Sequence, residues 1–178
     1  MGQLYIGVLL STLLLVLFSH SVTANTQLDE TAVPDNKAVL GWLQSVRLLP
    51  HKLRMTAKLD TGAKNSVMHA QSIEPFRQNG REWVRFIVPV SKKNKSVELR
   101  FELPVASKSR IKQHHISELD ERYMVKLDFC INGQVYTADF SLDNREKFNY
   151  PVLLGREFLK QHFIVDPAQT FTKKYHCQ

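Results

Sequence analysis

A single aspartate in a short turn motif is the residue of this 178-residue chain that is best placed for acid–base chemistry. Asp60 ends a run in which apolar and polar side chains alternate, as in a half-buried strand, and Thr61, Gly62 and Ala63 follow it. Glycine accepts backbone angles that other residues avoid, and a threonine hydroxyl bonds to nearby backbone groups, so we expect a tight turn here. A carboxylate held rigidly in such a turn suits general acid–base catalysis, although Asp-Thr-Gly also occurs in ordinary surface turns.

A short apolar run followed by glycine and arginine forms a second motif towards the end of the chain. Residues 151–154 are all apolar, Leu154 is followed by Gly155 and Arg156, and the pattern of a short helix comes next. With both motifs in this order, the chain resembles the retropepsins, aspartic proteases that work as homodimers. More closely, it resembles a bacterial retropepsin-like family often labelled ATP-dependent zinc proteases. The resemblance covers roughly Val39 to Phe171. The shared motifs are Gly41-Trp42, Ala57 to Ala63, Arg122-Tyr123, Asn144-Arg145, Leu154 to Arg156 and Val165 to Pro167.

Alternating apolar and polar residues predict that most of the chain forms short β-strands. We expect a long hairpin over residues 83–105 with a basic tip, preceded by a polar connection that contains Pro75. Asn132-Gly133 predicts a tight turn between two further strands. The predicted strands cover residues 39–49, 52–59, 66–68, 83–90, 96–105, 123–131, 135–142, 151–154 and 163–165, and the predicted helix covers 156–162. These elements predict a mainly-β fold, and with the resemblance we expect a small closed β-barrel of the retropepsin type with one short C-terminal helix.

The resemblance implies a specific reaction, the hydrolysis of peptide bonds in a peptide or protein substrate. In an aspartic protease, two carboxylates share one proton, the ionised one activates water, and the protonated one donates to the scissile carbonyl. Because this chain has one Asp-Thr-Gly, the resemblance implies a homodimer in which Asp60 of each chain meets at a two-fold axis. Asp60 would be catalytic, supported in its turn by Thr61, Gly62 and Ala63 and from beneath by Leu154, Gly155 and Arg156.

Two departures from the viral retropepsins leave a second class of function open. Those enzymes have an acid after Asp-Thr-Gly-Ala that pairs with the later arginine, but this chain has Lys64, so Arg156 needs another partner. A cation close to Asp60 would favour the ionised carboxylate, whereas a Lys64 that faces solvent would leave it alone. The flap, expected between Trp83 and Glu118, is longer and lacks a glycine-rich tip. The alternative is a non-catalytic module that binds an envelope peptide or protein on the same fold.

Neither zinc nor ATP is supported by the sequence, so we expect no cofactor. The seven histidines include His69 and the pair His114-His115, but none has the spacing of a metal site, and solvated loop positions are the simpler interpretation. No glycine-rich phosphate loop is present.

The N-terminal residues have the pattern of a secretory signal. Residues 1–24 contain no charged side chain, residues 6–18 form an apolar run too short to span a membrane, and Val22-Thr23-Ala24 suits cleavage. We therefore expect a signal peptide at 1–24, a linker at 25–37, the protease-like domain at 38–172 and a tail at 173–178, in a periplasmic or secreted protein. The alternative is an uncleaved anchor, which would be the route to a membrane surface.

The expected export affects how the net charge of +7 and the two cysteines are interpreted. Basic clusters at residues 92–95 and 108–112 could contact anionic polymers, but a solvated face is the preferred interpretation, and export makes nucleic acid an improbable partner. Disulfides persist outside the cytosol, so Cys130 is either a buried thiol or bridged to Cys177.

Overall fold

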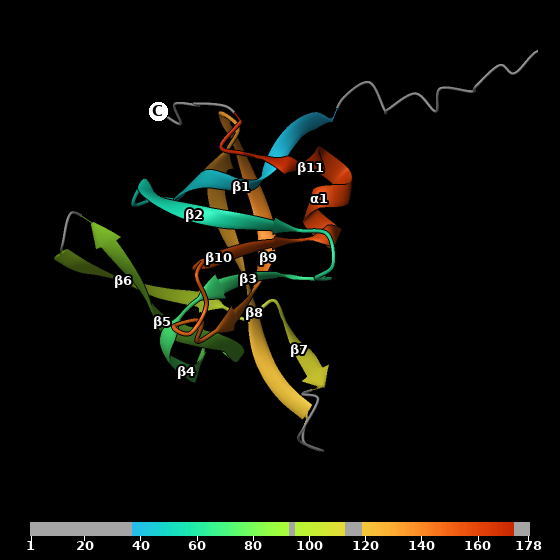
Figure 1. Cartoon of the computed structure of the whole chain (residues 1–178). Coiled ribbons are helices and arrows are strands. Elements are labelled where there is room, and N and C mark those ends of the chain that lie inside the picture. Colours follow the sequence, from blue (N-terminus) through green and yellow to red (C-terminus); the bar gives the residue numbers. More distant parts are fainter. Residues whose placement is uncertain (1–36, 93–94, 113–118, 173–178) are drawn as a thin grey trace, which may run out of the picture. The chain divides into compact units, whose positions relative to one another are not determined.

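The computed structural model describes residues 37–92, 95–112 and 119–172 (Figure 1). These residues form eleven strands and one helix. The elements are β1 (Ala38–Leu48), β2 (Leu53–Asp60), β3 (Ser66–His69), β4 (Gln71–Gln78), β5 (Arg81–Lys92), β6 (Lys95–Pro104), β7 (Ser107–Lys112), β8 (Leu119–Ile131), β9 (Gln134–Asp143), β10 (Val152–Gly155), α1 (Arg156–His162) and β11 (Phe163–Thr170).

Six of the strands close into a barrel. Neighbouring strands follow the order β1-β2-β10-β3-β9-β8, and β8 returns to β1 through the pairs Arg47–Cys130 and Leu48–Phe129. β11 is added beside β1, and β7 beside β8. The predicted mainly-β fold, a small closed barrel with one short helix, is confirmed.

Side chains that alternate along the strands fill the barrel. Because successive residues of a strand point to opposite faces, every second residue is buried from Met55 to Leu59 in β2 and from Val125 to Ile131 in β8. Helix α1 adds Phe158 and Leu159 to this core, and the Phe158 ring lies 5.3 Å from that of Phe129. The predicted bounds of the helix, 156–162, are those observed.

A second, three-stranded sheet contains the predicted hairpin. β5 and β6 pair in antiparallel fashion, with Phe86 opposite Phe101 and their rings stacked at 5.2 Å. The preceding segment was predicted to be a polar connection, and this was wrong: it is the edge strand β4. An edge strand is half exposed and tolerates Pro75, so it lacks the apolar alternation of an interior strand.

Two further differences from the predicted strands concern β7 and the end of β11. β7 was not predicted, because its basic sequence contains a single apolar residue and therefore no alternation. β11 continues to Thr170, five residues past its predicted end, because it runs beside β1 across a register shift at Gly41. A Cβ atom on Gly41 would lie within 2.3 Å of the Gln169 carbonyl oxygen, which accounts for the glycine of the Gly-Trp motif.

Several sequence-based predictions fall on residues outside the described ranges. These are the signal peptide, all of the linker but Lys37, the tail, the His114-His115 pair and Cys177. Cys130 is buried in β8 and disulfide-bonded, so the bridged alternative holds for this residue. Among the described residues, no helix is both long and apolar enough to cross a membrane.

Candidate active site

The two sequence motifs meet side by side in the barrel. β2 and β10 are parallel neighbours, and their register places Asp60 opposite Gly155 and Leu59 opposite Leu154. Leu59 and Leu154 are buried, so the Asp-Thr-Gly turn starts from a rigid part of the sheet. Residues 60–63 and 154–156 therefore lie next to each other in the structure.

Backbone N–H groups of the turn hold one oxygen of the Asp60 carboxylate. Oδ1 accepts hydrogen bonds from the N–H of Gly62 at 3.0 Å and from that of Ala63 at 3.3 Å. Each carboxylate oxygen has two lone pairs, so these bonds use the capacity of Oδ1 and fix the plane of the group. Oδ2 is the oxygen left for chemistry.

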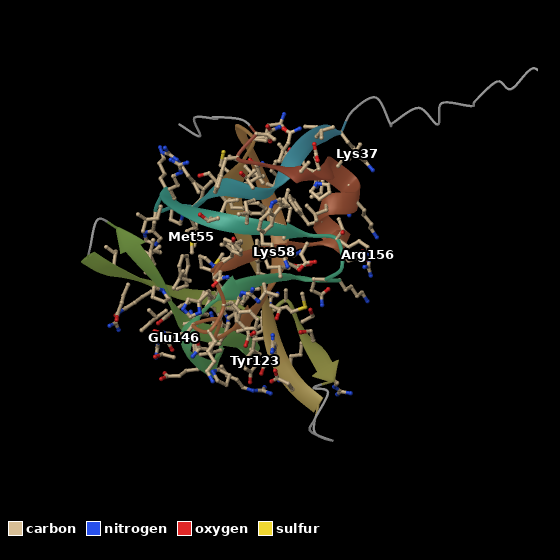
Figure 2. All side chains as sticks on the ribbon, in the orientation of Figure 1. Lys37, Met55, Lys58, Tyr123, Glu146 and Arg156 are labelled. Carbon is tan, nitrogen blue, oxygen red and sulfur yellow. The ribbon has the colours of Figure 1, made fainter. Side chains whose placement is uncertain are left out.

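A lysine two residues earlier on the same strand binds that second oxygen. Lys58 Nζ lies 2.9 Å from Asp60 Oδ2, with 39% of the lysine side chain and 23% of the aspartate side chain exposed (Lys58 is labelled in Figure 2). Burial raises the pKa of Asp60, but the hydrogen bond and charge of Lys58 and the two backbone N–H groups lower it by more. The pKa of this carboxyl therefore lies below its usual value.

Lys64 does not have the influence on Asp60 that sequence reasoning considered. Its side chain is exposed, and it is not among the groups that shift the pKa of Asp60. The relevant cation is Lys58, which the sequence analysis missed. Because side chains at positions i and i+2 of a strand point to the same face, the spacing of Lys58 and Asp60 was the signal that could have found it.

Helix α1 bonds directly to the turn, and strand β3 bonds to the adjacent Gly155. The Arg156 N–H donates to the Ala63 carbonyl at 2.8 Å, and Arg156 Nη1 donates to the Thr61 carbonyl at 3.0 Å (Arg156 is labelled in Figure 2). The partner that Arg156 was expected to need is thus a backbone carbonyl. Ser66, which the sequence analysis did not single out, is buried, and its Oγ accepts the Gly155 N–H at 3.1 Å.

Gly155 allows the closest approach in this brace, and its replacement should destabilise the fold. A Cβ atom at this position would lie 2.4 Å from the backbone carbonyl of Asn65, which cannot move aside without shifting the turn. We expect Gly155→Ala to lower the free energy of unfolding by about 3 kcal/mol in urea titrations followed by circular dichroism. Val135→Ala, at a side chain that is 63% exposed, is the control and should change it by less than about 0.5 kcal/mol. If Gly155→Ala and Val135→Ala changed the free energy of unfolding equally, the contact between Gly155 and Asn65 would be loosely packed.

A buried arginine forms a second polar cluster on the barrel. Arg145 donates its backbone N–H to His69 Nδ1 at 2.9 Å and its Nε–H to the Tyr150 carbonyl at 3.2 Å, and its guanidinium lies 4.4 Å from the centre of the Phe148 ring. Burial lowers the pKa of Arg145, although the carboxylates of Asp143 and Asp60 oppose this. His69 is therefore part of the fold and not the solvated loop residue that was predicted.

Arg122 extends this cluster. Its Nη1 donates to Asp143 Oδ2 at 2.7 Å, and its Nε donates to Asp120 Oδ2 at 2.8 Å. The sequence contained both arginines within shared motifs but offered no role for either. The structure joins them through Asp143, which ends β9 beside the segment that leads to β10.

An open groove of about 380 Å³ lies beside Arg145 and His69. Its walls come from the β5–β6 hairpin and from the segment before β10, and include Pro89, Glu98 and Phe148. The predicted flap region therefore contributes to this groove through β5 and β6. Lys108, from the second predicted basic cluster, instead pairs with Glu82 at 3.0 Å.

The described part of the chain contains no group of three or more His, Cys, Asp or Glu side chains arranged to hold a metal ion. At the Asp60 turn itself, the carboxylate has one oxygen fixed by backbone N–H groups and one oxygen that faces Lys58.

Comparisons with known proteins place the chain in a family. A family model described as retropepsin-like aspartic endopeptidase RimB matches residues 39–176. Two proteins named probable alpha-L-glutamate ligase are similar over part of their length. The one from Shewanella halifaxensis is 31% identical over 77% of this chain and 30% of its own, and the one from Desulfotalea psychrophila is 33% identical over 63% and 24%. This chain thus spans less than a third of the length of these relatives.

A solved structure from Legionella pneumophila, of a protein of unknown function, shares the fold. It is 35% identical, has a TM-score of 0.64, and the match covers 77% of this chain and 98% of that one. The family match extends over most of the chain, from β1 past the end of β11. This chain belongs to the RimB-like family of retropepsin-like aspartic endopeptidases.

Proposed function

We propose that the chain is an aspartic endopeptidase that hydrolyses peptide bonds with a water molecule activated by two Asp60 carboxylates, one from each chain of a homodimer. The observation that carries this proposal is the geometry of Asp60: two backbone N–H groups fix Oδ1, and Arg156 braces the same turn. A fixed carboxylate needs no reorganisation when it takes a proton from water.

The second carboxylate has to come from a second chain, because the sequence has a single Asp-Thr-Gly. In the proposed dimer, one Asp60 is ionised and accepts the proton of the water, and the other is protonated and donates to the carbonyl oxygen of the substrate. When the tetrahedral diol breaks down, the carboxyl that took the proton from water gives it to the leaving amine nitrogen, and the other carboxylate takes a proton from the diol hydroxyl, so the dyad again holds one proton. We further propose that the protein works in the periplasm or outside the cell, on the basis of the apolar N-terminal segment.

A non-catalytic binding module remains the second candidate, and one observation favours it. Lys58 occupies Asp60 Oδ2, the oxygen that catalysis would use. A salt bridge of this kind keeps the carboxylate ionised and would be acceptable in a domain that only binds peptides.

The experiment that decides between these candidates is the cleavage of an unbiased peptide library by the wild-type chain and by Asp60→Ala in parallel, followed by mass spectrometry. Glutamate-rich peptides belong in the library, because the ligase-named relatives contain a similar segment. We expect new termini with the wild-type chain at acidic pH and none with Asp60→Ala. Peptides that bind to both proteins and are cut by neither would support the binding module.

A further inference from the structure

Lys58 is held where it can reach Asp60 Oδ2. Its neighbours across the sheet are Leu43 on β1 and Leu153 on β10, whose side chains are 8% and 7% exposed. Paired residues in a sheet point to the same face, so these leucines flank the aliphatic part of Lys58. The ammonium group then meets Asp60 at 2.9 Å.

We propose that Lys58 is a positioning residue of the proposed active site, and that it sets the pH at which Asp60 takes up a proton and hence the pH range of the active dimer. This inference rests on the proposed function. Two carboxylates that meet at a two-fold axis repel each other, and this repulsion favours the shared proton that catalysis needs. A Lys58 ammonium on each carboxylate offsets the repulsion, so the one-proton state forms only at lower pH.

The other charged groups described near Asp60 bond to other partners, face solvent or act on Asp60 only through their charge. Arg156 of α1 uses its guanidinium on the Thr61 carbonyl, and Arg145, from the segment before β10, interacts with Asp60 only through its charge. Glu157 of α1 pairs with Lys160 at 2.6 Å, and Lys64 is exposed. Of the cations described, Lys58 is the one that forms an ion pair with the carboxylate of Asp60.

The direct test is to titrate Asp60 in the full chain by carboxyl-carbon NMR, with Asp60→Asn used for assignment. Lys58→Met keeps the aliphatic stem between the two leucines and removes the charge, Lys58→Arg restores it, and Lys64→Met is the matched control. We expect Lys58→Met to raise the pKa of Asp60 by at least about one unit, since a neighbouring opposite charge typically shifts a carboxyl by one to three. Lys58→Arg and Lys64→Met should leave it close to the wild-type value.

The pH profile of peptide cleavage provides the second measurement. The alkaline limb of activity should move to higher pH in Lys58→Met, return in Lys58→Arg and stay in place in Lys64→Met. An Asp60 titration that is the same in Lys58→Met and wild type would overturn the inference, as would a moved titration with an unmoved alkaline limb. If no variant cleaves peptide at any pH, the proposed function fails, and the NMR titration alone decides whether Lys58 controls Asp60.

Discussion

Asp60→Asn is expected to abolish peptide cleavage and to leave the barrel folded. The amide oxygen can still accept hydrogen bonds from the Gly62 and Ala63 N–H groups, so the turn keeps most of its contacts. The amide cannot take a proton from water, and loss of a general base typically costs between a hundred-fold and ten-thousand-fold in rate. We expect the cleavage rate to fall by at least about a thousand-fold, measured on the best peptide from the library screen.

Two controls make this result specific. The melting curve by circular dichroism should show the same cooperative transition for Asp60→Asn as for the wild-type chain, and mass spectrometry should show that the amide has not reverted to the acid. A variant that cuts peptide as fast as wild type would exclude the aspartic mechanism. Inhibition of the wild-type chain by chelators would reopen a metal-dependent mechanism.

Activity per chain is expected to rise with protein concentration. One chain supplies one Asp60, so the proposed site exists only after association, and dilution below the dimer dissociation constant removes it. The cleavage rate per chain should therefore follow the dimer fraction measured by analytical ultracentrifugation at the same concentrations. Unchanged activity in a dilution series that ends in pure monomer would exclude a shared site.

Mixing the two forms of the chain tests the same point without dilution. If wild type and Asp60→Asn exchange subunits at random in equal amounts, about a quarter of the dimers carry two Asp60 residues. The activity per wild-type chain should then fall to about half, because half of these chains have an inactive partner. Gly155→Ala, which disturbs the brace of the turn, is unsuitable as the partner because it weakens the fold.

The strands with an apolar face could be read directly from the sequence. From Val125 to Ile131 of β8, every second residue packs into the barrel, and the Asn132-Gly133 turn has the positive backbone angles φ, 56° and 78°, that such a pair allows. The helix from Arg156 to His162 was predicted with the observed bounds. The edge strands β4 and β7 were missed, because their sequences lack the apolar alternation of an interior strand.

In the candidate site, too, some features could be predicted from the sequence and others were visible only in the tertiary structure. Local turn chemistry in the sequence singled out Asp60 and its turn as a candidate, and the resemblance to the retropepsins singled out the Leu-Gly-Arg segment. Only the tertiary structure showed that Arg156 bonds to the Thr61 carbonyl, that Ser66 receives the Gly155 N–H, and that Lys58, not Lys64, meets the carboxylate. These contacts depend on which strands are neighbours and in what register. The strand neighbours and their register are decided by how the whole barrel closes around its core, and a local sequence pattern does not predict them.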